Sequence, residues 1–244
     1  MSHDIILYDV ELTTPNEIWS PNTCKTRFAL NYKGIPYKTV WLKFPEIGKK
    51  IPEITKNEAC RTVPIIIDVR NGNKVVHESW KIANYLEEAY PNTPSLFHGN
   101  IGAHFFIHEY CTKRLLPKIF KLNVFTVAEK AGEHQQWFVQ TREKAFKTSL
   151  DKFVGDQSIH AKAITENLVA LGRVLKHYPY LTGNQVGWAD ICLASYIIFL
   201  RVMRPDQFQA LIVNDKKAGK EFVEWLKRMD KYMQLNPPAP AARI

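Results

Sequence analysis

Four residues have the types and the spacing needed to hold an extended, peptide-like ligand. Pro64 follows Val63, and a cis bond between them would turn the N–H and C=O groups of Val63 outward, where an extended ligand could pair with them. Ser79 stands at the expected N-terminus of a helix, whose backbone N–H groups bind anions. Glu78 adds an acceptor for an ammonium group. Together these residues predict a binding half-site.

Each of these residues also has an ordinary structural interpretation. Ser79 could simply cap a helix, Glu78 could complement the helix dipole, and Pro64 could begin a strand, where its missing N–H group does no harm. Capping residues far outnumber ligand sites. The binding interpretation therefore depends on the order and spacing of the residues together.

The elements that must position these residues alternate between strand and helix signals. Pro21 lies at a helix start and Gly34 past the helix end, which is the usual arrangement for these two residue types. Asn71-Gly72 marks a hairpin turn. The predicted βαβ-ββα order comprises strands at 5–8, 37–42, 63–67 and 74–76 and helices at 21–33 and 79–90.

The pattern changes at Pro91–Pro94, after which only helical periodicity is convincing. We expect an α/β domain at 1–90, a linker at 91–100 and an all-helical domain at 101–244. The tail at 237–240 cannot continue a helix and suits an extended cover or a loose end. The helices expected in the second domain are 102–122, 131–153, 161–177, 189–203 and 217–235.

Composition excludes several classes of protein. The chain of 244 residues is 45% hydrophobic, which is sufficient for packed cores, and no apolar run is long enough to span a membrane. Its net charge of +9 is spread among acidic residues, so we expect small anionic ligands and not nucleic acid. We expect a cytoplasmic location, because residues 1–4 lead directly into a strand without an apolar signal region. We also expect no metal site, because the scattered cysteines have no ligand spacing: Cys24, Cys60, Cys111 and Cys192.

With Val63-Pro64, Glu78-Ser79, the proline-rich linker and a helical second half, the chain resembles a cytosolic glutathione transferase along nearly its full length. The resemblance implies a thioredoxin-like first domain, glutathione as co-substrate and a homodimer. It also implies that Val63, before a cis Pro64, pairs with the cysteinyl backbone of glutathione. Glu78 and Ser79 would bind the γ-glutamyl amine and carboxylate.

Residues 19–27 and 29–37 are similar to the fungal-specific (class A), etherase-like serine glutathione transferases, which are related to bacterial β-etherases. Where thioredoxin-like redox proteins carry two cysteines, this chain has Ser20 and Thr23, so that motif cannot support dithiol exchange. Residues 180–190 resemble the family's folding motif, in which Asp190 is structural. Gly187 replaces the usual Ser or Thr, which weakens the expected capping box.

Ser20 is the candidate catalytic residue. A free thiol has a pKa of about 8.5, so little thiolate is present at neutral pH. A hydrogen bond from Ser20 and the positive end of the following helix could together lower that pKa by about two units, which requires roughly 2.7 kcal/mol. The ordinary alternative is that Ser20 only caps the helix before Pro21.

The expected reaction is attack of the thiolate on an electrophilic carbon, which cleaves a β-aryl ether or conjugates a small aromatic compound. One alternative is a carrier that binds polyphenols, flavonoids or wood extractives without important turnover. Another is an omega-like thiol transferase that uses Cys24. We expect the acceptor pocket between the domains, with five candidate residues: Trp19, Phe105, His108, Tyr110 and Phe120.

Overall fold

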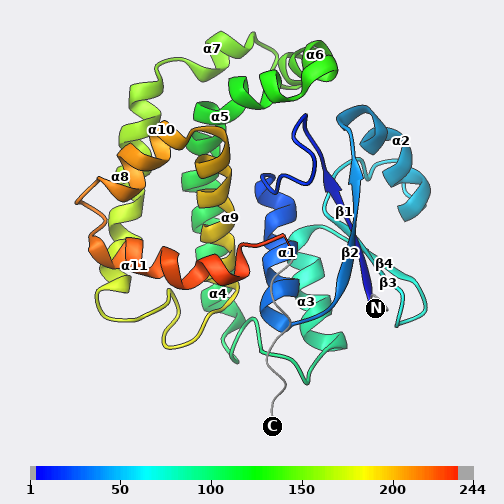
Figure 1. Cartoon of the computed structure of the whole chain (residues 1–244), viewed down its shortest axis with the longest axis horizontal. Coiled ribbons are helices and arrows are strands. Elements are labelled where there is room, and N and C mark those ends of the chain that lie inside the picture. The colour runs from blue at the N-terminus through cyan, green and yellow to red at the C-terminus, as the bar shows by residue number, and fades with distance from the viewer. Residues whose placement is uncertain (1–3, 236–244) are drawn as a thin grey trace.

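The computed structural model describes residues 4–235, so the proline-rich tail at 237–240 lies outside the described residues. Figure 1 shows two parts side by side: a sheet with its helices, and a larger set of helices. The four strands are arranged in the order β2-β1-β3-β4. Their bounds are β1 Ile5–Val10, β2 Tyr37–Leu42, β3 Ile65–Asp68 and β4 Lys74–His77.

The sheet is mixed because of how its strands are connected. β1 and β2 are parallel, with Ile5 opposite Tyr37, because the helix α1 (Pro21–Lys33) crosses between them. β3 and β4 form an antiparallel hairpin, and β3 also runs antiparallel to β1. The α/β prediction for the first domain is confirmed, with β3 beginning two residues later than the range 63–67 predicted from the sequence.

α1 lies between the sheet and the helical domain, where α3 (Ser79–Ala89) is its neighbour (Figure 1). It begins with Pro21 and ends at Gly34, whose φ of 67° is the left-handed conformation that glycine adopts readily. Most of its side chains are buried, because α9 (Trp188–Met203) covers the face turned away from the sheet. α1 is therefore part of both cores.

The helix α2 (Phe44–Thr55) is not among the elements predicted from the sequence. Its prolines explain why, since they resemble chain breaks in a one-dimensional pattern. Pro45 stands in the first turn, where no N–H partner is lost, and Pro52 lies in the last turn. Glu46 accepts a hydrogen bond from the Lys43 N–H group at 2.8 Å and so closes the helix start.

The second part is all helical, as predicted, but its helix bounds differ. The first helix continues through a π-helical turn at Cys111–Leu115 and extends to Lys130 instead of ending at residue 122. The expected single helix at 131–153 is wrong, because Lys147 adopts φ 56° and ends α6. The helices are α4 Ile101–Tyr110, α5 Leu116–Lys130, α6 Gln135–Phe146, α7 Leu150–Val154, α8 Gln157–Leu175, α9, α10 Pro205–Phe208 and α11 Lys220–Met229.

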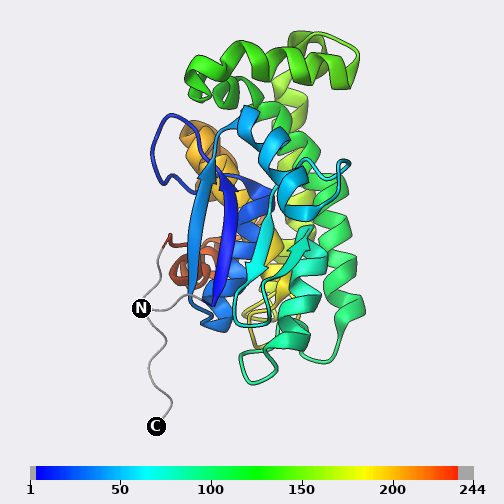
Figure 2. The same cartoon turned by 90° about the vertical axis from the view of Figure 1, so that its right-hand side faces the viewer.

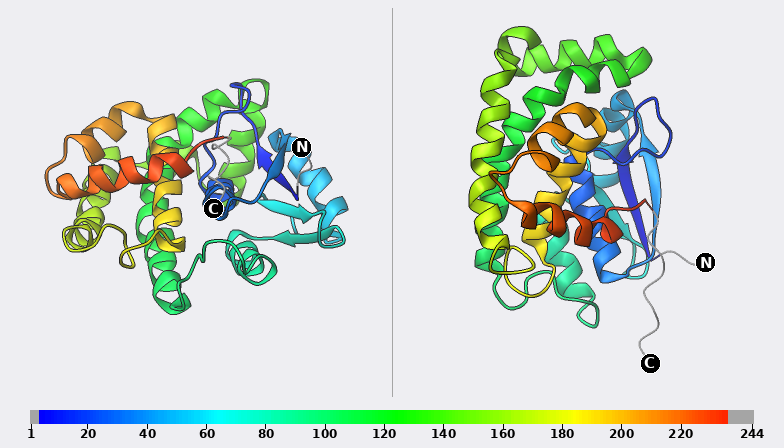
Figure 3. Two further views of the ribbon diagram at one scale, coloured as in Figure 1. Left: turned by 60° about the horizontal axis from the view of Figure 1, so that its bottom comes forward. Right: turned by 60° about the vertical axis from the view of Figure 1, so that its left-hand side comes forward.

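α9 packs against α4, α5, α10 and α11. α5 packs against both α8 and α9, and α11 crosses the face that α8 and α9 form (Figure 3). α6 reaches over one end of the sheet domain (Figures 1 and 2), where its Trp137 stacks on Phe44 with the ring centres 6.1 Å apart. The segment 91–100 that joins the two parts contains neither helix nor strand.

Asp190 has the structural role expected from the folding motif. It is completely buried and accepts hydrogen bonds from the Leu181 N–H at 2.9 Å, the Gly187 N–H at 3.1 Å and the Trp225 indole at 2.8 Å. Gly187 fits because of its neighbour: a Cβ atom there would lie 2.3 Å from Cε1 of His104. The departure from Ser or Thr therefore makes room for His104.

Candidate active site

Ser20 stands at the N-cap of α1 in extended conformation, with φ −66° and ψ 118°. Its carbonyl accepts hydrogen bonds from the Cys24 N–H at 2.8 Å and the Thr23 hydroxyl at 3.1 Å. Its own hydroxyl makes no hydrogen bond to any residue within 4–235. The hydroxyl is therefore free to donate to an anion at the positive end of the helix.

The register of the sheet brings the predicted site residues to one end of the first domain. Tyr8 near the end of β1 faces Ile65 at the start of β3, and Ile65 faces His77 at the end of β4. The chain enters β3 through Pro64, and α1 begins after the loop that follows β1. The segments meeting at this end contain Ser20, Val63, Pro64, Glu78 and Ser79.

The Val63–Pro64 peptide bond is cis, and Val63 is half-buried while Pro64 is buried. Directly after β4, Glu78 has φ 75°, an uncommon conformation for a residue with a side chain. Glu78 is the N-cap of α3 and Ser79 its first helical residue, which corrects the expectation that Ser79 caps the helix. Such conformations persist where surrounding structure imposes them, often at functional sites.

Cys24 lies one turn into α1 and is completely buried. Burial, reinforced by the neighbouring Asp9 carboxylate, raises the pKa of its thiol far above the ordinary value of 9.0. A thiol in this state provides no nucleophilic thiolate at neutral pH, which disfavours the thiol-transferase alternative. The four cysteines are all free and buried: Cys24, Cys60, Cys111 and Cys192.

Two of the five acceptor candidates have clear packing roles. The Trp19 indole donates to the Val10 carbonyl at 3.0 Å, and its ring lies 5.9 Å from that of Phe199. Phe120 packs edge-on against the stacked rings of Phe146 and Phe153. These contacts attach loops and helices to the core.

Of the other candidates, Tyr110 donates its hydroxyl proton to the Asn167 carbonyl at 2.9 Å, whereas Phe105 and His108 of α4 lie around Trp80, a residue that was not predicted from the sequence. Trp80 directly follows Ser79, and its ring lies 4.9 Å from Phe105, 5.6 Å from His108 and 5.9 Å from Trp188. This aromatic cluster holds the start of α3 against α4 and α9. The available signal was a large aromatic residue directly after Ser79, since aromatic side chains bury much apolar area and pack against other rings.

Two histidines of α4 are buried as neutral side chains. Burial lowers the pKa of both His104 and His108 to about 4, aided at His104 by His98 and at His108 by Lys25 and Lys113. Nδ1 of His108 accepts a hydrogen bond from the Trp188 indole at 3.2 Å. Protonation of that nitrogen would remove the acceptor.

The two histidines predict acid sensitivity. The pKa of each histidine is lower in the folded protein than in the unfolded chain, so the folded protein loses stability as pH falls from about 6.5 towards 4. Each histidine should lower the free energy of unfolding by about 2 kcal/mol between pH 7 and pH 5. Burial raises the pKa of Asp190 to about 6. Protonation of this carboxylate therefore stabilises the folded protein as pH falls, by roughly 1 kcal/mol between pH 7 and pH 5. Urea unfolding of His108→Gln at both pH values should show about 2 kcal/mol less pH dependence, with exposed His177→Gln as control. Equal pH dependence of wild type and His108→Gln would contradict the assignment.

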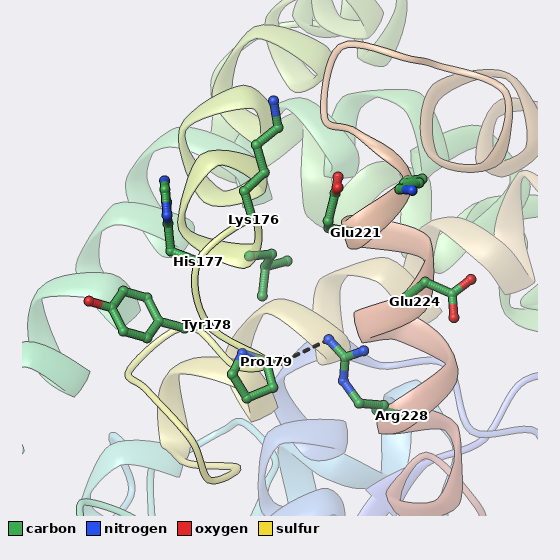
Figure 4. Close-up of a pocket in the computed structure, with 9 residues that line it drawn as sticks. Lys176, His177, Tyr178, Pro179, Glu221, Glu224 and Arg228 are labelled. Atoms are coloured by element: carbon green, nitrogen blue, oxygen red, sulfur yellow. Dashed lines mark hydrogen bonds between the residues drawn. The ribbon is translucent and has the colours of Figure 1, made fainter.

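Two pockets lie in the helical domain. One of about 460 Å³ is mostly apolar and lies between α4, α8 and the loop before α4, with Tyr110 among its lining residues. The other, of about 350 Å³, lies between the end of α8 and α11 and is lined by charged side chains that include Lys176, Glu221 and Arg228 (Figure 4). Tyr110 is the one predicted site residue that lines either of these two pockets, and neither is lined by Ser20, Val63 or Ser79, so neither matches the interdomain acceptor pocket expected from the sequence.

Within residues 4–235, no group of three or more His, Cys, Asp or Glu side chains could hold a metal ion. Over the same range, no helix combines the length and the apolar character needed to cross a membrane.

Known proteins match both halves of this architecture. The family model described as glutathione S-transferase, N-terminal domain, matches residues 19–94, and the model for the C-terminal domain matches residues 103–232. The glutathione S-transferase-like protein ustS of Aspergillus flavus is 26% identical over 217 residues, which cover 78% of each chain.

Solved structures share the fold. The glutathione transferase GSTFuA3 of Phanerochaete chrysosporium has a TM-score of 0.81 at 29% identity, covering 94% of this chain and 97% of its own. The glutathione S-transferase CsGST63524 of Ceriporiopsis subvermispora, solved in complex with glutathione, has a TM-score of 0.80 at 24% identity, covering 97% and 100%. With both domain models matched in order along the chain, this protein belongs to the glutathione S-transferase family.

Proposed function

We propose that this glutathione transferase acts on small aromatic compounds, cleaving β-aryl ethers or conjugating aromatic electrophiles, and that Ser20 stabilises the glutathione thiolate. The observation that carries the proposal is the free Ser20 hydroxyl at the N-terminus of α1, at the same end of the sheet as Val63 and Ser79. The resemblance of residues 19–37 to etherase-like transferases supports the aryl ether as substrate.

Glutathione would extend across the end of the sheet. Its cysteinyl backbone would pair with Val63, and its γ-glutamyl group would meet Glu78 and the N–H groups that begin α3. This arrangement places the sulfur near the start of α1. There the Ser20 hydroxyl and the helix dipole favour the anion over the thiol.

The reaction follows from that anion. The thiolate attacks the carbon that bears the aryloxy group, a C–S bond forms and the C–O bond breaks. The electron pair of the broken bond leaves with the aryloxide, which takes a proton from solvent. A thioether of glutathione and a phenol are the products, and neither oxidant nor reductant is consumed.

Ser20→Ala tests this role. The variant loses the hydrogen bond but keeps the helix dipole, so about half of the roughly 2.7 kcal/mol of thiolate stabilisation should disappear, which lowers kcat/KM about 10-fold for a β-aryl ether that releases a fluorescent phenol. Titration of the bound thiolate by its ultraviolet absorbance should show a higher thiol pKa in the variant. Thr23→Val is the matched control, because the Thr23 hydroxyl is bonded within the helix to the Ser20 carbonyl. Equal rates for wild type and Ser20→Ala would remove Ser20 from the mechanism.

A second candidate function is a carrier of aromatic ligands. The pocket of about 460 Å³ favours it, because its size and mostly apolar lining match those of small-molecule sites. Calorimetry with a set of polyphenols and flavonoids, run beside an activity screen, separates the two functions. Tight saturable binding without product would favour carriage over catalysis.

We also propose that the protein is a homodimer in the cytoplasm. Three exposed apolar side chains lie on α4, where Ile101 is 48%, Phe105 42% and Phe106 71% exposed. Large apolar side chains gathered on one exposed helix favour an interaction surface. Phe106→Glu should convert the dimer to a monomer in light scattering after size-exclusion chromatography. A monomeric wild type, or an unchanged dimer in Phe106→Glu, would contradict this interface.

A further inference from the structure

Trp80 connects the start of α3 to the helical domain. It is the second residue of α3, directly after Ser79, and its side chain is half-buried. Rings from the linker, α4 and α9 pack around it, with centres 4.9 to 5.9 Å from its own: Phe97, Phe105, His108 and Trp188. The position of this side chain is therefore set by segments that lie outside the first domain.

Hydrogen bonds connect the segments that carry these rings. The Trp188 indole donates to Nδ1 of His108 at 3.2 Å, and the Trp188 backbone N–H donates to the Leu96 carbonyl at 2.8 Å. Trp188 itself is completely buried at the start of α9. Because the linker, α4 and α9 are joined in this way, the rings around Trp80 form one connected support, and tilted aromatic pairs stabilise one another beyond the area they bury.

The backbone directly before Trp80 adopts a conformation that needs support. Glu78 has φ 75°, which is uncommon for a residue with a side chain and persists where surrounding structure imposes it. On one side, the pairing of His77 with β3 holds the end of β4. On the other side, the Glu78 carbonyl accepts a hydrogen bond from the Ile82 N–H at 2.9 Å and so belongs to the first turn of α3. Glu78 and Ser79 therefore lie between the sheet and the support around Trp80.

The same segment carries the groups that would bind the γ-glutamyl end of glutathione. The first N–H groups of a helix have no intrahelical partner, so those of Ser79 and Trp80 are available to its carboxylate. The exposed Glu78 side chain would accept hydrogen bonds from its amine. A rotation of the backbone at Glu78 would turn both sets of groups away from the ligand.

We propose that Trp80 is a positioning residue of the glutathione site, through which the helical domain orients Glu78 and Ser79 for the γ-glutamyl group. The inference rests on the proposed glutathione site. The ring contacts of Trp80 carry it, because they supply a restraint that the backbone at Glu78 requires. Without that restraint, glutathione would have to order this segment as it binds, and its affinity would fall.

A second tryptophan offers a matched comparison. Trp137 of α6 also joins the two parts of the molecule, since its ring stacks on Phe44 with the centres 6.1 Å apart. Phe44 begins α2, however, and no candidate glutathione residue lies on that helix. Loss of the Trp137 ring would therefore weaken a contact between the domains without changing the start of α3.

Trp80→Leu tests the proposal, because it removes the ring contacts and keeps an apolar side chain in α3. Calorimetry should show that it weakens binding of glutathione about 10-fold, since part of the binding free energy is then needed to order Glu78 and Ser79. With an aromatic electrophile as second substrate, KM for glutathione should rise in parallel, while kcat at saturating glutathione changes less than about 2-fold. Trp80→Phe retains a ring and should restore most of the affinity. Trp137→Leu should leave the affinity for glutathione within about 2-fold of the wild type.

A purely structural role for Trp80 would give different results. Trp80→Leu would then unfold at a lower temperature but bind glutathione as tightly as the wild type, and that outcome would overturn the proposal. Equal losses of affinity in Trp80→Leu and Trp137→Leu would also overturn it, because they would reflect the packing of the domains in general.

Phe97→Leu keeps the proposal testable if Trp80→Leu does not fold. It removes one of the four rings without altering α3, so the affinity for glutathione should fall about 3-fold, and an unchanged affinity would contradict the proposal. Wild-type protein that does not bind glutathione would instead refute the glutathione site itself. The two failures are therefore distinguishable.

Discussion

Asp190→Ala is expected to lower the free energy of unfolding by about 3 to 5 kcal/mol, because three buried donors would lose their acceptor at once. The Leu181 and Gly187 N–H groups and the Trp225 indole all bond to this one carboxyl group. They belong to the loop before α9, the start of α9, and α11. A single substitution would therefore loosen three segments of the helical domain.

Urea unfolding at pH 7, followed by far-ultraviolet circular dichroism, measures the loss. Asp190→Asn is the matched control, since it keeps a carbonyl acceptor of nearly the same shape. It should retain part of the stability that alanine loses. A loss below 1 kcal/mol in Asp190→Ala would show that the loop before α9 is held by other contacts.

Asp9→Leu is expected to cost a similar 3 to 5 kcal/mol, because it leaves a buried guanidinium without its counter-charge. Nη2 of Arg27 lies 2.8 Å from Asp9 Oδ2, and the side chains are 0% and 2% exposed. The remaining partners of Arg27 are neutral: its Nη1 bonds the hydroxyls of Tyr37 at 3.2 Å and Thr39 at 3.1 Å.

The double variant Asp9→Leu/Arg27→Met separates charge from packing. Removing both charges should recover most of the stability that Asp9→Leu loses, since apolar residues of similar volume often replace a buried ion pair at little cost. Thermal unfolding of the two single variants and the double variant completes the cycle. Additive losses would mean that the two side chains do not depend on each other.

Local signals were sufficient for most of the first domain. Alternating periodicity, the proline at the start of α1 and the glycine after it predicted the strands and α1 because these features act within a few residues. α2 and the break at Lys147 were missed for different reasons. Pro45 and Pro52 are residues that usually end a helix, so their positions in the sequence did not indicate one. A lysine is a good helix former, so Lys147 did not indicate a helix end with φ 56°.

The candidate site also contains residues that could be predicted from the sequence and residues that could not. The residues whose chemistry depends on their own segment, such as Ser20 and Glu78, could be proposed from order and spacing. The contacts of Trp19 and Phe120 could not, since aromatic residues at helical spacing do not reveal which neighbour they meet. Trp80 and Lys25 contact side chains of α9, which is distant in sequence. Only the folded structure shows these contacts.

The burial of α1 on both faces has a consequence for modularity. The candidate glutathione residues all belong to the first ninety residues, which suggests that this part of the chain could bind glutathione on its own. Yet Asn31 of α1 donates to the Tyr232 carbonyl at 2.8 Å, and Trp19 packs on Phe199. A fragment cut at the linker would expose the face of α1 that α9 covers. Recombination that exchanged one half of this chain for that of a relative would have to carry a compatible α9 along with it.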